Sequence, residues 1–185
     1  MKKTILTFGT ISGVIISVMM LVTNSFQDQI GFDRGEVLGY TSMVLAFLLI
    51  YFGVRSYRDN VAGGTISFGR ALKVGALIAA VASGWYVATW QLIYYRLSPD
   101  FGERYQAHML DKARADGETE EQIAKRQADM VKFAQLYRNP AINVAITFLE
   151  PLPVALVMAL VSAGVLSRKR KEDLDLGVSG ARVLT

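Results

Sequence analysis

Apolar residues are gathered along the chain into four long stretches, residues 5–22, 37–54, 74–95 and 141–166. The stretches hold 18, 18, 22 and 26 residues, and Glu150 is their single charged side chain. A helix of about 20 apolar residues crosses a hydrocarbon layer of about 30 Å, so each stretch is long enough to span a bilayer. The pattern predicts an all-α integral membrane protein, a bundle of four helices.

The overall composition hides this segregation. At 52% hydrophobic and 19% charged residues it is close to an ordinary globular domain. The charges are crowded outside the spans, which excludes a soluble enzyme with one mixed core. The side that holds both termini and the loop after the second span has eleven Lys and Arg against four acids, and the other side has nine against eleven. The positive-inside rule therefore places both termini in the cytoplasm.

The chain lacks the residues that several kinds of chemistry require. There is no Cys, and His108 is the single histidine, so a catalytic zinc site or a histidine-based triad is not expected. The sequence has no phosphate-binding loop motif and no continuous basic face that would indicate nucleic-acid binding. We expect no enzyme activity, metal, cofactor or nucleic-acid partner, and the lipid bilayer is the expected partner.

The first stretch has one alternative interpretation. Lys2 and Lys3 precede it, as in a secretory signal peptide. However, 18 apolar residues exceed the usual core of a signal peptide, and no clear cleavage site follows. We therefore expect an uncleaved helix and a single four-span domain over residues 1–171, followed by a flexible cytoplasmic tail, residues 172–185.

Aromatic residues gather near the span ends. Trp85, Tyr86, Trp90, Tyr94 and Tyr95 lie toward the outer half of the third span. Amphipathic rings prefer the headgroup level of a membrane, so these residues indicate an interfacial belt. A binding site built from Trp85 and Trp90 is the alternative.

Residues 96–140, between the third and fourth spans, have helix signals of their own. Ser98 and Pro99 suggest one helix start, and a capping box at Thr119 suggests another. Apolar residues recur at helical spacing in both halves, at Phe101, Tyr105, Met109, Ala113, Ile123, Met130, Phe133 and Tyr137. The loop is predicted to be an outer amphipathic hairpin joined near residues 115–118. It is either a solvated charged hairpin or a partner-binding or lid element.

Small residues at helical spacing mark where the spans can approach one another. Gly9, Gly13 and Ser17 form a ridge on the first span, and similar ridges follow on the third and fourth spans, at Ala71, Gly75, Ala79, Ser83, Ala155, Ala159 and Ala163. Packing within the bundle explains these ridges, and a homodimer through Gly9, Gly13 and Ser17 is the alternative.

Glu150 lies about 14 Å inside the fourth span, where a charged carboxylate is costly. It should therefore face the bundle interior or a wet cavity. Pro151 and Pro153 follow it and are expected to kink the helix. Hydroxyl groups at matched depth on the other spans complete a candidate polar site of Glu150, Tyr86, Ser42 and Ser12, with Ser17 as the alternative on the first span. Such a site is either a static clamp or a proton or cation site of a transporter.

The connection between the second and third spans is short, glycine-rich and basic. Arg55, Arg58, Arg70 and Lys73 flank it and are the candidate contacts for an anionic lipid headgroup. Plain anchoring at the membrane surface is the alternative use of these residues.

Combined motifs resemble those of a bacterial inner-membrane family of small four-span proteins, catalogued as a domain of unknown function. They are residues 53–59 (GVRSYRD), residues 64–75 (GTISFGRALKVG), Tyr86 with Trp90, Asp100 with Phe101, Asn139 with Pro140, and Glu150 with Pro151. The resemblance covers about residues 4–170. It implies one domain in a bacterial inner membrane, and it implies no activity. With the orientation given by the positive-inside rule, residues 96–140 are then expected in the periplasm.

Taken together, these features predict a multi-pass membrane protein with a structural role or a role in binding a partner or lipid. The alternative is a small proton- or cation-coupled transporter that uses Glu150. An intramembrane enzyme is disfavoured, because no set of nucleophile, base and metal ligands converges in the sequence.

Overall fold

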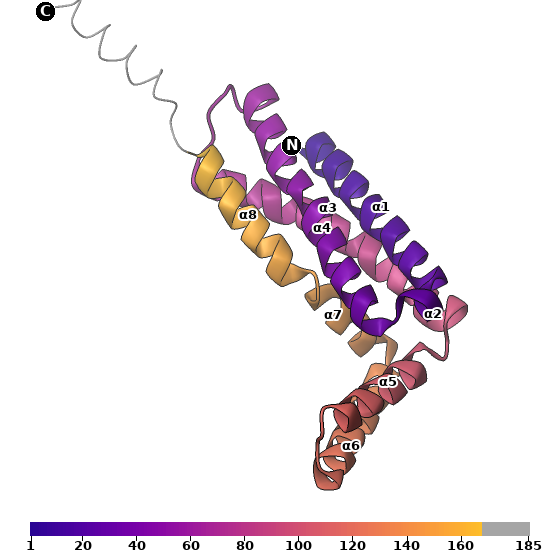
Figure 1. The fold of residues 1–185 in the computed structure, drawn as a ribbon. Helices are drawn as coiled ribbons and strands as arrows, with labels where there is room; N and C mark the ends of the chain where they lie inside the picture. The colour runs from indigo at the N-terminus through magenta and orange to yellow at the C-terminus, as the bar shows by residue number, and fades with distance from the viewer. Residues whose placement is uncertain (168–185) are drawn as a thin grey trace, which may run out of the picture.

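The computed structural model describes residues 1–167, whose regular secondary structure is entirely helical (Figure 1). The long elements are α1 (Lys2–Ser25), α3 (Phe32–Asn60), α4 (Phe68–Leu92) with the π-helical turn η1 (Ile93–Leu97), and α7 (Pro140–Leu149) with α8 (Leu152–Leu166). The short helix α2 (Gln27–Ile30) links the first two. Helices α5 (Phe101–Ala115) and α6 (Glu120–Tyr137) project from one end of the bundle.

The four predicted spans are confirmed. Helices over Lys2–Ser25, Phe32–Asn60, Phe68–Leu97 and Pro140–Leu166 are long and apolar enough to cross a membrane. The first three exceed their apolar stretches by several residues, because flanking polar residues continue the helical hydrogen bonding, and the fourth begins one residue earlier, at Pro140. Residues 172–185, for which a flexible tail is predicted, lie outside the described residues.

The bundle core is formed where α1, α3, α4 and α8 meet. Helix α4 packs against the other three, and α1 also packs against α3. The largest side chains enclosed there are Phe47, Ile50, Val54, Val74 and Ile78. The outward faces expose large apolar side chains, including Leu6, Ile11, Val18, Leu45, Leu156, Val157 and Val161. An apolar exterior of this kind is suited to contact with lipid.

The small-residue ridge of the first span lies inside the bundle. Gly9 and Gly13 of α1 meet α4 so closely that a Cβ atom at Gly13 would lie 2.6 Å from the Cβ of Trp85. One turn further along, Thr89 donates a hydrogen bond of 2.7 Å to Ser17. The ridge is therefore occupied within the chain and is not an exposed surface for a second copy.

The fourth span breaks at Glu150 and Pro151, between α7 and α8, so the predicted kink is confirmed. Pro151 and Pro153 have no backbone N–H, which removes two hydrogen bonds from the helix at this point. Helix α8 packs against α3 and α4, whereas α7 packs against α4 and α6. Among residues 1–167, α7 makes no comparable contact with α3. The break therefore leaves the hairpin-side half of this span separated from α3.

Helices α5 and α6 form the predicted amphipathic hairpin. Gly117 at its tip has φ 78°, a left-handed conformation that favours glycine. The capping box is confirmed, because the backbone N–H of Thr119 donates to Gln122 Oε1 at 2.8 Å and its hydroxyl oxygen accepts from the Gln122 backbone at 3.3 Å. The two helices enclose a small apolar cluster of Leu110, Ala113 and Ile123.

The expected helix start at Ser98 and Pro99 is wrong, because α5 begins at Phe101. Instead of capping the helix, the Ser98 hydroxyl donates a hydrogen bond of 3.0 Å to the side chain of Asn24 near the end of α1. A tertiary contact has thus replaced the local cap and ties the base of the hairpin to the first span.

Candidate functional site

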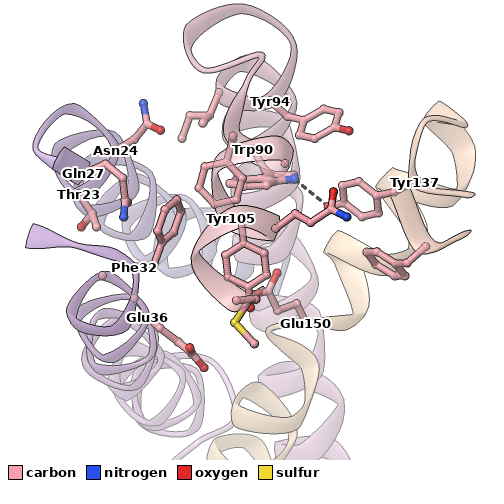
Figure 2. A pocket seen from close by; sticks show the side chains of 18 of the residues that line it. Thr23, Asn24, Gln27, Phe32, Glu36, Trp90, Tyr94, Tyr105, Tyr137 and Glu150 are labelled. Atoms are coloured by element: carbon pink, nitrogen blue, oxygen red, sulfur yellow. Dashed lines mark hydrogen bonds between the residues drawn. The ribbon is translucent and has the colours of Figure 1, made fainter. Parts of the chain in front are cut away.

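A cavity of about 1100 Å³ lies where the hairpin meets the membrane helices (Figure 2). Helices α1, α2 and α3 line one side, and α4 with its π-helical turn lines another. The hairpin of α5 and α6 covers the remaining end of the cavity. Ser42, Tyr86 and Glu150 line the part within the spans, and Glu118 and Arg126 line the part formed by the hairpin. The cavity therefore continues from the membrane region to the polar surface.

The break in the fourth span explains why this space exists. Where α8 packs against both α3 and α4 the bundle is filled, as the enclosed side chains of Phe47 and Ile78 show. On the hairpin side of the break, α7 no longer lies against α3. The space that a continuous helix would fill is therefore left to the cavity, with Glu150 at the break itself.

Two carboxylates belong to the membrane part of the cavity, Glu150 and Glu36 of α3. Figure 2 shows both side chains directed into the space between the helices. Tyr86 of α4 and Glu36 are both close enough to Glu150 to act on its carboxyl group. The structure thus brings the predicted Glu150 and Tyr86 together in one cavity, and it adds a second acid, Glu36, that was not predicted.

The predicted hydroxyl groups have separate positions. Ser42 lines the same part of the cavity, but its hydroxyl donates to a backbone carbonyl of its own helix at 2.6 Å. Ser12 is buried between α1 and α3, where it donates to a backbone carbonyl of α3 at 2.8 Å. Ser17 is bonded to Thr89. Among residues 1–167, therefore, hydroxyls from all four spans do not converge on Glu150.

The remaining wall is rich in aromatic and methionine side chains. The aromatic residues are Phe32, Tyr40, Tyr86, Trp90, Tyr94, Phe101, Tyr105, Phe133 and Tyr137, and the methionines are Met19, Met20, Met43, Met109 and Met130. Rings offer π faces, and methionine side chains adapt their shape, so this wall suits an apolar guest of irregular outline.

The two tryptophans do not share a site. Trp90 lines the cavity, and its ring meets that of Phe101 edge-on with centroids 5.0 Å apart. Trp85 lies on another face of α4, where it packs over Gly13 and remains 43% exposed. The binding site expected from Trp85 and Trp90 is therefore not formed, although Trp90 contributes to a different one.

A chain of hydrogen bonds fastens the hairpin to the membrane helices. Trp90 Nε1 donates to the Tyr137 hydroxyl at 2.8 Å, and that hydroxyl lies 3.0 Å from the hydroxyl of Thr147. Gln91 Nε2 donates to Asn143 Oδ1 at 2.8 Å. Asn143 and Thr147 are buried on α7, where unpaired polar groups would be costly. The network joins α4, α6 and α7 along one wall of the cavity.

Ion pairs hold the opposite side of the hairpin to the corner between α2 and α3. Arg104 pairs with Asp28, and Lys112 donates to Asp33 at 2.9 Å. A ring nitrogen of His108 lies 3.3 Å from the same Asp33 carboxylate. The hydrogen bond with Asp33 raises the pKa of Lys112, so this lysine stays charged at neutral pH. The rings that pack across the joint are those of Phe32, Phe101 and Tyr105.

Gln27 of α2 also lines the cavity (Figure 2). Its Nε2 atom is inaccessible to solvent and has no hydrogen-bond partner among residues 1–167. A buried amide donor without a partner costs free energy, about 1–3 kcal/mol. This side chain is therefore an unsatisfied polar group in the cavity wall.

The candidate lipid contacts lie at the other end of the bundle. Arg55 and Arg58 both pair with Asp59, at 3.6 and 2.7 Å. Arg70 and Lys73 are exposed on the first turns of α4. The shared acid lowers the net positive charge that Arg55 and Arg58 can offer a lipid, so Arg70 and Lys73 are the stronger candidates.

Three contributors were not predicted from the sequence: Glu36, Gln27 and Asn143. Glu36 precedes the apolar stretch and resembles an ordinary flanking charge. A signal was nevertheless available, because Glu36, Tyr40 and Met43 follow a helical spacing that places them on one face. For Gln27 and Asn143 no comparable pattern exists, since their roles depend on α2 and on α7 leaving α3.

The fold and the cavity define a helical multi-pass membrane protein with an aromatic, acid-containing cavity at the hairpin end. The chain belongs to the family described as "Protein of unknown function (DUF4199)", which matches residues 7–168. No curated protein and no solved structure matches it. The resemblance to a domain of unknown function is thereby confirmed.

Proposed function

We propose that this protein is a non-enzymatic membrane protein that binds an amphipathic molecule in the cavity between the hairpin and the spans. The cavity of about 1100 Å³ is the observation that carries the proposal, because ligand cavities of proteins commonly measure about 300–1,000 Å³. Its walls pass from apolar and aromatic groups within the spans to charged groups on the hairpin. A molecule with an apolar body and a polar end matches this gradient.

The separation of α7 from α3 supplies an entry route from the bilayer. Apolar side chains on both flanking helices are exposed here, including Val37 and Tyr40 on α3 and Val144 and Leu149 on α7. An amphipathic molecule dissolved in the membrane leaflet can pass between these helices without crossing water. The hairpin then covers the polar end of the guest.

Native mass spectrometry of the protein in lipid nanodiscs tests this function. We expect one tightly held amphipathic molecule to remain on the wild-type protein after annular lipid has been stripped away. A variant with a filled cavity should lose it. If the wild-type protein retains nothing, or if both proteins retain the same molecules, the cavity is not a binding site.

For orientation, we propose a bacterial inner membrane with the hairpin in the periplasm and both termini in the cytoplasm. Among the described residues, the end opposite the hairpin has a single acid, Asp59, and its basic residues support this orientation: Lys2, Lys3, Arg55, Arg58, Arg70 and Lys73. Because the chain has no Cys, labelling of a single introduced cysteine shows on which side of the membrane that one residue lies. Glu121→Cys on the hairpin should react with an impermeant maleimide in cells with a permeabilised outer membrane. Gly69→Cys should react only after lysis, and the reverse pattern would overturn this orientation.

A small proton- or cation-coupled transporter is the second candidate. Glu150 beside a broken helix, facing a cavity that reaches the hairpin surface, supports it. Binding without transport is favoured by the filled core beyond Glu150, where Phe47, Ile50 and Ile78 are fully buried. A proton-dependent flux in reconstituted vesicles that disappears in Glu150→Gln would favour the transporter instead.

A further inference from the structure

We propose that the ligand is an amphipathic organic cation whose positive group is held between Glu36 and Glu150. This inference rests on the proposed binding function and adds the charge and the chemical class of the ligand. It is carried by the position of the two carboxylates in the membrane part of the cavity, together with the aromatic wall that surrounds them.

Acidic residues outnumber basic residues in the cavity lining, and the basic ones lie only on the hairpin. Its ionisable lining residues other than tyrosines are Glu36, Glu118, Lys125, Arg126, Asp129 and Glu150. Both basic residues come from α6, on the hairpin. Arg126 is paired with Glu118 there, and Asp129, one helical turn from Lys125, pairs with Lys132. Within the spans, Glu36 and Glu150 therefore face the cavity without a basic lining residue.

Neighbouring cations are held by other acids. Arg104 pairs with Asp28, and Lys112 pairs with Asp33. Neither basic residue lines the cavity, and although the charge of Lys112 also acts on Glu36, its ion pair is with Asp33. Two carboxylates close enough for their charges to act on one another are stabilised by a positive charge between them.

The wall around the acids suits an organic cation better than a bare ion. The rings that line the cavity present π faces, which attract a positive charge within about 6 Å of a ring centroid. They also supply the apolar surface that a hydrophobic cation requires. In contrast, no group of three or more His, Cys, Asp or Glu residues that could hold a metal ion is found in residues 1–167.

An anionic amphiphile fits the charge pattern poorly. Its head would meet Glu36 and Glu150 inside the spans, or else remain at the hairpin, where Glu118 and Asp129 also line the cavity and Arg126 is already paired with Glu118. Repulsion between like charges is strong where water is scarce, so such a ligand is selected against.

The test compares two ions of similar size and shape but opposite charge, tetraphenylphosphonium and tetraphenylborate. Binding of each radiolabelled ion is measured by equilibrium dialysis with the full chain in phosphatidylcholine nanodiscs, after subtraction of binding to empty nanodiscs. We expect saturable binding of the phosphonium alone. Glu36→Gln and Glu150→Gln should each weaken it about tenfold or more, because each removes one charged contact. The control Glu121→Gln, on the hairpin but outside the cavity lining, should leave it within about twofold.

The outcomes separate this inference from the proposed function. Equal binding of both ions, blocked by a filled cavity, would show an amphiphile site without charge preference and would overturn the inference alone. Unchanged phosphonium binding in Glu36→Gln, Glu150→Gln and the double variant would overturn it as well. If neither ion binds and the wild-type protein retains no amphiphile in native mass spectrometry, the proposed function fails together with it. Thermal unfolding curves check that each Gln variant is folded.

Discussion

A tryptophan in place of Gly39 is expected to abolish ligand retention and leave the protein folded. Gly39 lies on α3 and lines the cavity, and no heavy atom lies within 4 Å of the place its Cβ would occupy. An indole side chain can therefore enter the cavity without displacing backbone, and it occupies the space that the guest needs. We expect bound amphiphile to fall about tenfold or more, as native mass spectrometry or phosphonium binding would measure.

Gly84→Trp provides the matched control for this substitution. Gly84 is also a helical glycine with open space around its Cβ position, but it lies on α4 away from the cavity lining. Both variants add the same side chain to a membrane helix, so a general effect of tryptophan would appear in both. If Gly84→Trp lost the ligand as fully as Gly39→Trp, the cavity would not be the site.

Replacement of Gly13 by Leu is expected to cause the largest loss of stability. A Cβ atom at Gly13 would already lie 2.6 Å from both Cβ and Cδ1 of Trp85, and Leu adds three more carbons. Helix α1 must then move away from α4, which strains the bond between Ser17 and Thr89. We expect a destabilisation of about 3 kcal/mol, which corresponds to an apparent unfolding midpoint about 6–12 °C lower in nanodiscs.

Two further variants make this prediction specific. Gly84→Leu adds the same side chain where nothing lies within 4 Å and should leave the midpoint nearly unchanged. Trp85→Ala combined with Gly13→Leu should recover part of the loss, because it removes the side chain that the leucine meets. A Gly13→Leu protein as stable as Gly84→Leu would show that α1 and α4 are not packed in this way.

Much of the fold could be predicted because it depends on local patterns. The length of each apolar stretch determines a span, and the capping box at Thr119 with a glycine at position 117 determines the hairpin. The failure at Ser98 is instructive, because this residue was expected to cap α5 and instead bonds to Asn24. A local preference worth about 1 kcal/mol is easily overridden by a tertiary contact.

The candidate site could be predicted only in part. The single acid in an apolar stretch stands out in the sequence, so Glu150 was found, and Tyr86 followed from its matched depth. Ser12 was predicted from its depth as well, but the structure places it away from Glu150. Depth gives a residue's height along a helix but not the direction that it faces in the bundle. Glu36 was missed because a charge beside a span is common and rarely marks a site.

By itself, the sequence determined which segments are long and apolar enough to cross a membrane, that a helical hairpin lies between the last two of them, and that one acid lies inside the spans beside two prolines. These features follow from hydrophobic length, capping and the missing N–H of proline, all of which act within a few residues. The tertiary structure decided that α7 leaves α3 at the break, that the space is covered by the hairpin, and that Glu36 shares it with Glu150. Such features depend on which helix faces pack together, and packing joins residues more than one hundred positions apart in the chain.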